Sequence, residues 1–442
     1  MSKKLRIFCL IVFLIPCLKA QEILSLKDAV AIGLENNFDI KIAEKDQQIN
    51  SNNNSLGNAG FLPTVDLSVD KTFQTQDVEL EIQGSEGTFD VNRDGAKSDR
   101  FNAGANFNWT IFDGFAMFIA RDRLVELESQ GLLKKKVTVE NTIAAIYNTY
   151  YQIVFEQDRL AVLNETLEIS EARRAFAKSR YEVGKGSKLN YLTAQVDYNT
   201  DQSNVLRQEE LLNNARIDLN LLLGRDSKAI FQASESIDVN PALQLELLLQ
   251  KVSDLNPSLL SAISDQNVAF LEYKELAAER YPKLNLGLSY NQGTSNNDAG
   301  QLRSSTINGI SYGFTASWNI FDGFNKTREI QNAKIQREIS QLEKESLELS
   351  LRGAVNAAFI NYSNNLKLIG LEEANVTIAL ENGQIALDRY ELGAGTSLEL
   401  REAQRNAVDS QNRLLDARLN AKLAEIELLR LSGSILTSVA PN

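Results

Sequence analysis

The sequence predicts an internally duplicated α+β membrane protein in which each half supplies two amphipathic strands and one very long helix. Three observations support this fold class. A seven-residue stretch that begins at Trp109 recurs at Trp318, 209 residues later, with six of its seven positions identical, which indicates internal duplication. Apolar and polar residues alternate before each copy. No proline follows each copy until Pro241 and Pro441, so the helices are free to be long.

Residues 1–20 are expected to form a signal peptide. A basic start at residues 3–6 precedes a short apolar run at residues 7–18, and Ala20 is a small residue at a suitable cleavage position. The alternative, lipid attachment at Cys17, has weaker support because targeting motifs of this kind have low specificity.

Composition excludes several classes of function. Cys9 and Cys17 are the only cysteines, both lie in the expected leader, and there is no histidine. The mature chain therefore lacks the commonest nucleophile, base and transition-metal ligands, and we expect no enzyme activity, no metal and no cofactor. The net charge is −12, or −16 without the leader, which disfavours nucleic acid as a partner. No later apolar run approaches the ~20 residues of a transmembrane helix, so the mature chain is either soluble or crosses a membrane as strands.

The first repeat is expected to span residues 21–225. A helix from Leu26 to about Gly60 ends before Pro63, because the residue before proline is disfavoured in the α conformation. A strand hairpin follows at 64–112. Its period-two alternation is clearest from Phe101 to Ile111, which predicts a strand with one apolar and one polar face. The connection 73–100 shows no period and is expected to be a loop.

A long helix follows the hairpin. Asp113 is expected to be its N-cap, and the helix should run from Phe115 to Val183, which is about 100 Å at ~1.5 Å per residue. A turn at 184–187 reverses the chain, because Gly184 suits a C′ position with positive φ. A returning helix then ends near Leu223.

The second repeat is expected to span residues 243–434, after a linker at 226–242. Its elements are a strand hairpin at 283–321 with a connecting loop at 292–309, a long helix from Phe324 to Leu392, a turn at 393–396 and a returning helix at 398–431. Residues 435–442 form a C-terminal tail. The first copy carries ten extra residues in its strand connection, since Pro282 follows Pro63 by 219 residues rather than 209.

Four strands cannot close a barrel by themselves, because the smallest barrels need about eight. An open sheet edge cannot face lipid, because its backbone groups would lack hydrogen-bond partners. If the strands cross a membrane, copies of the chain must therefore complete the barrel together, with eight strands from two copies or twelve from three.

From Leu26 to Gly433 the chain resembles the TolC-like outer-membrane efflux family. The resemblance depends on the paired Phe-Asp-Gly-Phe strand exits, the prolines before strands, and the Arg-Tyr-x-x-Gly-x-Gly-Ser/Thr turns at Arg180 and Arg389. It implies a homotrimer with a twelve-stranded β-barrel in the outer-membrane lipid of a Gram-negative cell and a long α-helical barrel across the periplasm. It also implies a passive conduit of a tripartite efflux or type I secretion system, opened at its periplasmic tip by an inner-membrane transporter and a periplasmic adaptor.

The resemblance assigns the pore entrance to Asn190, Glu399 and Glu402. Asn190 departs from the family's acidic residue, and Gly395 stands where the family has a basic gate residue. The alternative to a role of Glu399 at the pore entrance is a capping box with Thr396. The alternative for Glu402 is a position on a solvated outer face of its helix.

Two further groups of residues complete the candidate sites. The periplasmic tip and partner-docking residues are Tyr181, Gly184, Lys185, Gly186, Ser187, Tyr390, Gly393, Ala394, Gly395 and Thr396. The junction between barrel and tunnel comprises Trp109, Asp113, Gly114, Trp318, Asp322 and Gly323. The two tryptophans fit an interfacial aromatic belt, with packing of a strand on a core as the alternative. The alternative function is that of a secreted structural or adhesive coiled-coil protein with a small β cap.

Overall fold

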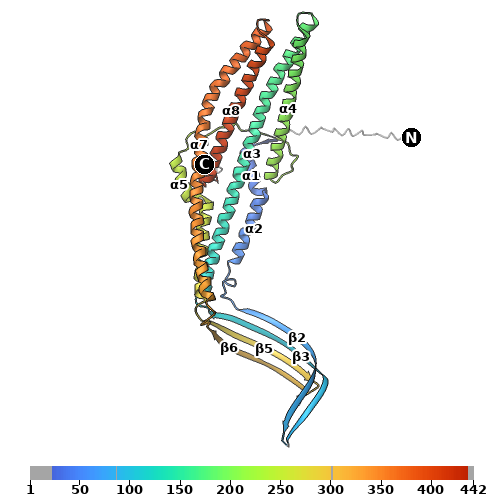
Figure 1. Cartoon of the computed structure of the whole chain (residues 1–442), viewed down its shortest axis with the longest axis vertical. Coiled ribbons are helices and arrows are strands. Elements are labelled where there is room, and N and C mark those ends of the chain that lie inside the picture. The colour runs from blue at the N-terminus through green and yellow to red at the C-terminus, as the bar shows by residue number, and fades with distance from the viewer. Residues whose placement is uncertain (1–21, 86, 300–301, 437–442) are drawn as a thin grey trace, which may run out of the picture. The chain divides into compact units, whose positions relative to one another are not determined.

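The computed structural model describes residues 22–85, 87–299 and 302–436 (Figure 1). The expected signal peptide, Cys17 and most of the expected tail lie outside these residues. The chain divides into two compact units, each described by itself. Unit 1 comprises Met1–Lys41, Thr138–Asn256 and Leu351–Asn442, and unit 2 comprises Ile42–Val137 and Pro257–Ser350.

Unit 2 contains a four-stranded antiparallel sheet with the order β2-β3-β5-β6 (Figure 1). The strands are β2 (Thr64–Gly84), β3 (Gly87–Phe112), β5 (Lys283–Asn297) and β6 (Ser304–Ser317). The ladder between β3 and β5 joins the two repeats. Consequently, among the residues that the structure describes, β2 and β6 each have only one neighbouring strand.

One side of this sheet is apolar and the other is polar, because directly opposed residues in an antiparallel ladder share a face. Val65 pairs with Phe107, Phe107 with Leu288, and Leu288 with Tyr312. The next row pairs Asp66, Asn106, Ser289 and Ser311 in the same way. The alternation predicted from the sequence therefore continues across all four strands.

The prediction of loops at 73–100 and 292–309 is wrong for most of these residues. β2 and β3 remain paired up to Gly84 and Gly87, and β5 and β6 extend to Asn297 and from Ser304. The first strand pair lost its apparent period because the apolar residues change parity after Phe73, as described below. The second hairpin also ends early, since β6 stops at Ser317 rather than at residue 321.

Four helical segments of unit 2 lie in the order α2, α3, α6, α7. They belong to α2 (Phe38–Asn53), α3 (Ala116–Glu182), α6 (Pro257–Ala278) and α7 (Asn325–Glu391), of which α2, α3 and α7 also include residues of unit 1. Lys135 of α3 pairs with Glu44 of α2 at 3.4 Å, and Arg123 of α3 pairs with Glu275 of α6 at 2.8 Å. Lys326 of α7 pairs with Glu279, just after α6, at 2.6 Å.

Unit 1 contains the hydrophobic core. Its elements are α1 (Leu26–Asn36), α4 (Lys188–Leu222), α5 (Leu245–Leu255), α8 (Ser397–Leu431) and the later parts of α3 and α7, with β1 (Glu22–Leu24) parallel to β4 (Phe231–Ala233). The hydroxyl of Tyr150, which is fully buried, donates to the backbone oxygen of Leu24 at 2.8 Å. The expected linker at 226–242 supplies buried Phe231, and the expected tail supplies buried Ile435, so both segments enter this core.

An asparagine breaks the first expected helix and has an exact counterpart in the second repeat. Asn37 separates α1 from α2, and its side-chain amide donates to the backbone oxygen of Leu222 at 2.9 Å. Asn256 separates α5 from α6 and donates to Leu431 at 2.8 Å. Each asparagine therefore satisfies a free carbonyl at the end of a returning helix. Among the described residues, no helix is both long and apolar enough to cross a membrane.

Candidate functional site

Both hairpin tips of unit 1 end their long helix in the same hydrogen-bonded turn. At the first tip, Gly184 N–H donates to Tyr181 at 3.1 Å and Lys185 N–H donates to Arg180 at 2.8 Å. At the second tip, Gly393 and Ala394 make the same bonds to Tyr390 and Arg389, at 3.1 and 2.9 Å. Gly184 and Gly393 have φ of 73° and 75°. This geometry is the Schellman motif, in which glycine adopts the left-handed conformation without steric cost.

The second glycine of each tip is needed for close approach. A Cβ on Gly186 would lie 3.0 Å from Arg180 Cβ, and one on Gly395 would lie 3.2 Å from Arg389 Cβ. A side chain at either position would therefore be in tight contact with the end of its helix, and the neighbouring atoms would have to shift by a few tenths of an ångström.

The returning helices begin with the expected N-caps. The Ser187 hydroxyl accepts from Asn190 N–H at 3.2 Å. The Thr396 hydroxyl accepts from Glu399 N–H at 3.1 Å, and the Glu399 carboxylate accepts from Thr396 N–H at 3.3 Å. The capping box proposed as the alternative role of Glu399 is thus present. It uses one carboxylate oxygen, so it does not prevent a second role.

The three entrance candidates are all exposed. Asn190 lies on the first tip, while Glu399 and Glu402 line one open groove between α7 and α8. The two acidic side chains are therefore brought together, and Asn190 belongs to a different hairpin.

The tips also expose aliphatic side chains that the sequence-based analysis missed. Val183 and Leu392 are 64% and 84% exposed, and Leu189 and Leu398 are 72% and 78% exposed. Each pair is related by the same 209-residue offset as the tip motifs. The signal was present as two hydrophobic residues flanking each glycine turn.

Tyr181 and Tyr390 differ in their contacts. Tyr181 stacks on Tyr191 of its own hairpin, with ring centroids 6.2 Å apart. Tyr390 packs edge-on against Phe176 of α3 at 5.6 Å. The second tip is therefore in contact with the first hairpin through Tyr390.

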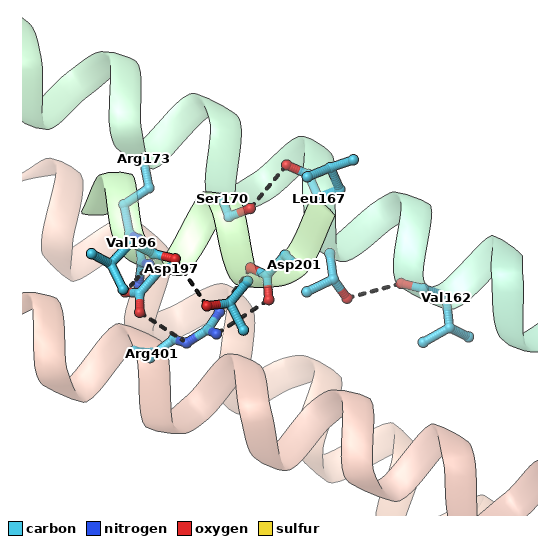
Figure 2. Close-up of polar contacts among 10 residues, drawn as sticks. Val162, Leu167, Ser170, Arg173, Val196, Asp197, Asp201 and Arg401 are labelled. Atoms are coloured by element: carbon cyan, nitrogen blue, oxygen red, sulfur yellow. Dashed lines mark hydrogen bonds and ion pairs between the residues drawn. The ribbon is translucent and has the colours of Figure 1, made fainter. Parts of the chain in front are cut away.

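A cluster of four charged residues joins the two hairpins below the tips (Figure 2). We call Arg173, Asp197, Asp201 and Arg401 the inter-hairpin cluster. Arg401 of α8 donates two hydrogen bonds to Asp201 of α4, at 2.9 and 3.2 Å, and lies 3.9 Å from Asp197. Arg173 of α3 pairs with Asp197, and its side chain has no exposed surface.

Burial makes this cluster energetically important. The side chain of Asp201 is 6% exposed and that of Arg401 is 29% exposed. Burial alone would lower the pKa of Arg401, but hydrogen bonding to Asp201 and the charges of Asp201 and Asp197 raise that pKa above its ordinary value. The guanidinium therefore remains charged, and the loss of either partner would leave a poorly solvated charge.

The internal repeat does not reproduce this cluster. At an offset of 209 residues, Arg401 corresponds to Leu192, and Asp197 and Asp201 correspond to Asn406 and Ser410. Charged residues that lack a charged counterpart in the other repeat were the only sequence signal for the cluster.

The tryptophans of the junction make equivalent hydrogen bonds in unit 2. The indole N–H of Trp109 donates to the backbone oxygen of Phe61 at 2.9 Å, and that of Trp318 donates to Arg280 at 3.0 Å. Each acceptor lies two residues before the proline that precedes a strand. The two tryptophan residues are 39% and 62% exposed, so neither is a core residue in the single chain. Each indole hydrogen bond joins the end of one strand to the start of its partner.

The aspartates of the junction are not located at the N-cap position. α3 begins at Ala116, after Gly114 and Phe115, which have φ of 77° and 72°. This left-handed pair brings the Asp113 carboxylate to Met117 N–H at 2.9 Å. Asp322, Gly323 and Phe324 repeat the arrangement, with a 2.6 Å bond from Lys326 N–H to Asp322. Each aspartate therefore accepts a hydrogen bond from a first-turn N–H, as predicted, although the aspartate is not itself the N-cap residue.

Gly114 also has no room for a side chain. A Cβ at this position would lie 2.5 Å from the backbone oxygen of Ala278.

Within the described residues, no group of three or more His, Cys, Asp or Glu side chains is arranged to hold a metal ion.

Comparison with known proteins identifies relatives over most of the chain. A family model described as "Outer membrane efflux protein" matches residues 32–225 and 248–434. The Vibrio cholerae outer membrane protein TolC is 23% identical over 354 residues, covering 77% of this chain and 78% of that protein. The Pseudomonas aeruginosa pyoverdine export outer membrane protein OpmQ is 25% identical over 397 residues, covering 86% and 78%.

Solved structures share the fold. The Campylobacter jejuni CmeC outer membrane channel aligns with a TM-score of 0.75 at 14% identity, covering 92% of this chain and 85% of that chain. The open state of the Neisseria gonorrhoeae MtrE outer membrane channel aligns with a TM-score of 0.71 at 16% identity, covering 93% and 89%. The fold class predicted from the sequence is confirmed by these matches.

Proposed function

The chain belongs to the outer membrane efflux protein family, and we propose that three copies form the passive outer-membrane conduit of a tripartite efflux or type I secretion system. This membership favours the conduit over the secreted coiled-coil alternative. The number three comes from the family resemblance, and three copies of a four-stranded sheet provide twelve strands. The proposed assembly has no catalytic role.

The proposal depends mainly on one observation: the two edge strands of the sheet, β2 and β6, are the repeat counterparts of β5 and β3, which pair with each other inside the chain. Under the internal repeat, β3 corresponds to β6 and β5 corresponds to β2. The β3–β5 ladder that joins the repeats within one chain therefore has a counterpart between β6 of one chain and β2 of the next. Such a contact is heterologous and forms a closed ring when its rotation closes.

The repeat also specifies the register of this contact. Phe107 pairs with Leu288 in the β3–β5 ladder. In the internal repeat, Phe107 corresponds to Ala316 at an offset of 209 residues, and Leu288 corresponds to Val69 at an offset of 219 residues. In the ring, Ala316 of one chain should therefore lie opposite Val69 of its neighbour, on the apolar face.

The helices of unit 2 leave matching edges. In the order α2, α3, α6, α7, the outer helices carry exposed aliphatic residues. Ile42 and Ile49 of α2 are 59% and 55% exposed, and Ile335, Leu342 and Leu349 of α7 are 53%, 64% and 74% exposed. Contact between α7 of one chain and α2 of the next would remove this apolar surface from water, worth about 25 cal/mol per Å².

A pair of cysteines tests the ring. Val69→Cys with Ala316→Cys should form disulfides between chains under oxidation, because the Cβ atoms of directly opposed residues are about 4.5–5.5 Å apart, within a small shift of the ~3.5–4.5 Å that a disulfide spans. The expected product is a covalent trimer on a non-reducing gel. Val69→Cys with Ser317→Cys is the control, since Ser317 lies on the other face. Equal cross-linking of the two variants, or a product with another number of chains, would contradict the proposed ring.

We infer that the tips form the partner-docking and gating end of the conduit. The glycine turns at Gly184–Ser187 and Gly393–Thr396 hold exposed aliphatic residues at the chain reversals, and such residues suit an apolar contact with a periplasmic adaptor that accompanies the inner-membrane transporter. Tyr181, Lys185 and Tyr390 belong to this docking surface. The groove containing Glu399 and Glu402 supports a role in cation selectivity at the entrance, with Asn190 as an uncharged position.

Planar-bilayer recording tests conduction directly. The purified protein should give discrete single-channel currents, whereas a structural coiled-coil protein would give none. Recovery of the mature chain as a monomer in the periplasmic fraction would reject the conduit.

A further inference from the structure

The outer part of the β2–β3 hairpin extends beyond the rest of the sheet. β3 pairs with β5 only as far as Ser98, but it stays paired with β2 as far as Gly87. We call residues 78–84 of β2 and 87–93 of β3 the distal ribbon. This ribbon has no further strand beside it in the described structure, and Figure 1 shows the hairpin bending where the ribbon begins.

The distal ribbon has an apolar and an acidic face. Leu80 lies opposite Val91, and Ile82 lies opposite Phe89. Glu81 lies opposite Asp90 in the alternate row. The two faces therefore differ in chemistry as sharply as the two faces of the sheet.

A β-bulge connects the ribbon to the sheet. The register shifts between Gln76 and Val78, so that Asp77 opposes two residues of β3, namely Asp94 and Gly95. Gly95 has φ of 64°, and its N–H donates to the Asp77 carboxylate at 2.7 Å. Positive φ at a glycine is typical of the bulge class that bends a strand and increases its twist.

The apolar face of the ribbon lies on the polar side of the sheet. The extra residue lies on β3, so side chains along β2 continue to alternate without interruption. Val78 and Leu80 therefore follow the even-numbered row that contains Asp66 and Asp70, while the apolar face of the sheet is the odd-numbered row that contains Val65. The apolar residues of β2 thus change from odd-numbered to even-numbered positions between Phe73 and Val78.

A contact at the base of the ribbon supports a fixed bend. The Arg93 guanidinium donates to the backbone oxygen of Asp298, in the connection between β5 and β6. Asp298 N–H in turn donates to the backbone oxygen of Lys97 at 2.9 Å. Arg93 is opposite Val78, so this contact forms on the side of the ribbon that carries the apolar face.

The ribbon is long enough to reach the axis of the proposed barrel. Residues 78–84 span about 24 Å at ~3.4 Å per residue. Twelve strands spaced ~4.8 Å apart and tilted by ~40° enclose a barrel with a radius of about 12 Å.

We propose that the distal ribbons of the three chains meet over the outer mouth of the barrel and close it. This inference rests on the proposed function, because it takes the polar side of the sheet to face the lumen of the proposed barrel. The occupant of each apolar face is the equivalent face of the other copies, formed by Val78, Leu80, Ile82, Phe89 and Val91. Contact among the three copies removes these side chains from water, and it leaves Glu79, Glu81 and Asp90 on the outer surface.

Cysteine substitution on adjacent residues tests this closure. The two native cysteines, Cys9 and Cys17, lie in the expected leader, so the parent protein provides the background. Leu80→Cys should form disulfide-linked dimers in oxidised outer membranes, reaching about two-thirds of the chains because one bond uses two of three symmetric copies. Glu81→Cys, on the acidic face, should give at least about fivefold less. Phe89→Cys and Asp90→Cys form an independent pair on β3.

The Val69→Cys and Ala316→Cys ring separates failure of this proposal from failure of the proposed function. If that ring forms and Leu80→Cys links no better than Glu81→Cys, the ribbons do not meet. Quenching of a fluorophore on Leu80→Cys by brominated phospholipid would show that the apolar face contacts lipid, which would also overturn the proposal. The contact between ribbons is non-covalent, so the ribbons can separate in the reduced protein and allow current. In planar bilayers, oxidised Leu80→Cys should therefore conduct several-fold less than the reduced protein, and equal conductance would reject closure.

Discussion

Replacement of Arg401 is predicted to release the contact between the two hairpins near the tips. Arg401→Gln removes two charge-assisted hydrogen bonds, of 2.9 and 3.2 Å, from Asp201. Exposed ion pairs contribute about 0.2–1 kcal/mol, and removal of one partner from a fully buried pair costs about 3–5 kcal/mol. Because Asp201 is 6% exposed and Arg401 is 29% exposed, we expect a loss of about 2 kcal/mol.

Hydrogen exchange measures this loss as a local opening free energy. Since about 1.4 kcal/mol corresponds to a tenfold change in an equilibrium constant, amides of α4 and α8 around Asp201 should exchange about 30-fold faster in Arg401→Gln. Arg405 provides the control, because its side chain is 71% exposed and only 3.9 Å from Asp409, and Arg405→Gln should change exchange by less than about twofold.

A double variant determines whether charge is the cause. Arg401→Gln with Asp201→Asn removes both charges, so no uncompensated carboxylate remains and most of the protection should return. Unchanged exchange in Arg401→Gln, or an equal effect of Arg405→Gln, would refute the assignment of the inter-hairpin cluster as a stabilising contact between the hairpins.

Three further predictions concern the junction, the core and the entrance. Gly114→Ala should lower the free energy of unfolding of the purified protein by roughly 2–4 kcal/mol, because Gly114 has positive φ and an added Cβ would clash with a backbone oxygen at the end of α6. Gly353→Ala is the control for this thermal-denaturation measurement, because the space around Gly353 is open and the substitution should not lower the free energy of unfolding. Burial raises the pKa of Tyr151 to about 12 from 10.0, so the unfolded chain loses this proton first and stability should fall by at most about 2.7 kcal/mol as pH rises from 10 to 12; Tyr151→Phe should remove this fall in pH-dependent denaturation. Glu399→Gln with Glu402→Gln should shift the reversal potential in a planar bilayer toward anions, and an unchanged potential would reject these residues as the selectivity site.

The repetitive elements were predictable from the sequence because their signals are local. Period-two alternation predicted the faces of β3 and β6, and the glycine pairs predicted the tip turns at Gly184 and Gly393. Thr396 and Glu399 follow a spacing that has one common structural meaning, the capping box. Each of these features depends on residues that are close in sequence.

The parts that could not be predicted depend on contacts between distant residues or on changes of register. The distal ribbon looked aperiodic because apolar residues change from odd to even positions between Phe73 and Val78. The inter-hairpin cluster joins Arg401 to residues about two hundred positions earlier, with no motif to relate them. The expected linker at 226–242 enters the core through β4, because three residues of strand pairing with β1 satisfy its backbone.

The inter-hairpin cluster has a consequence for an assembled conduit. In a ring of three chains, neighbouring hairpins would meet along six seams of two alternating kinds. The seam inside each chain contains Arg401 and Asp201, and the seam between chains contains their neutral counterparts Leu192 and Ser410. This charged contact would therefore join the two hairpins of each chain, and it would be absent from the three seams between chains, so the six seams of the ring would not be chemically equivalent.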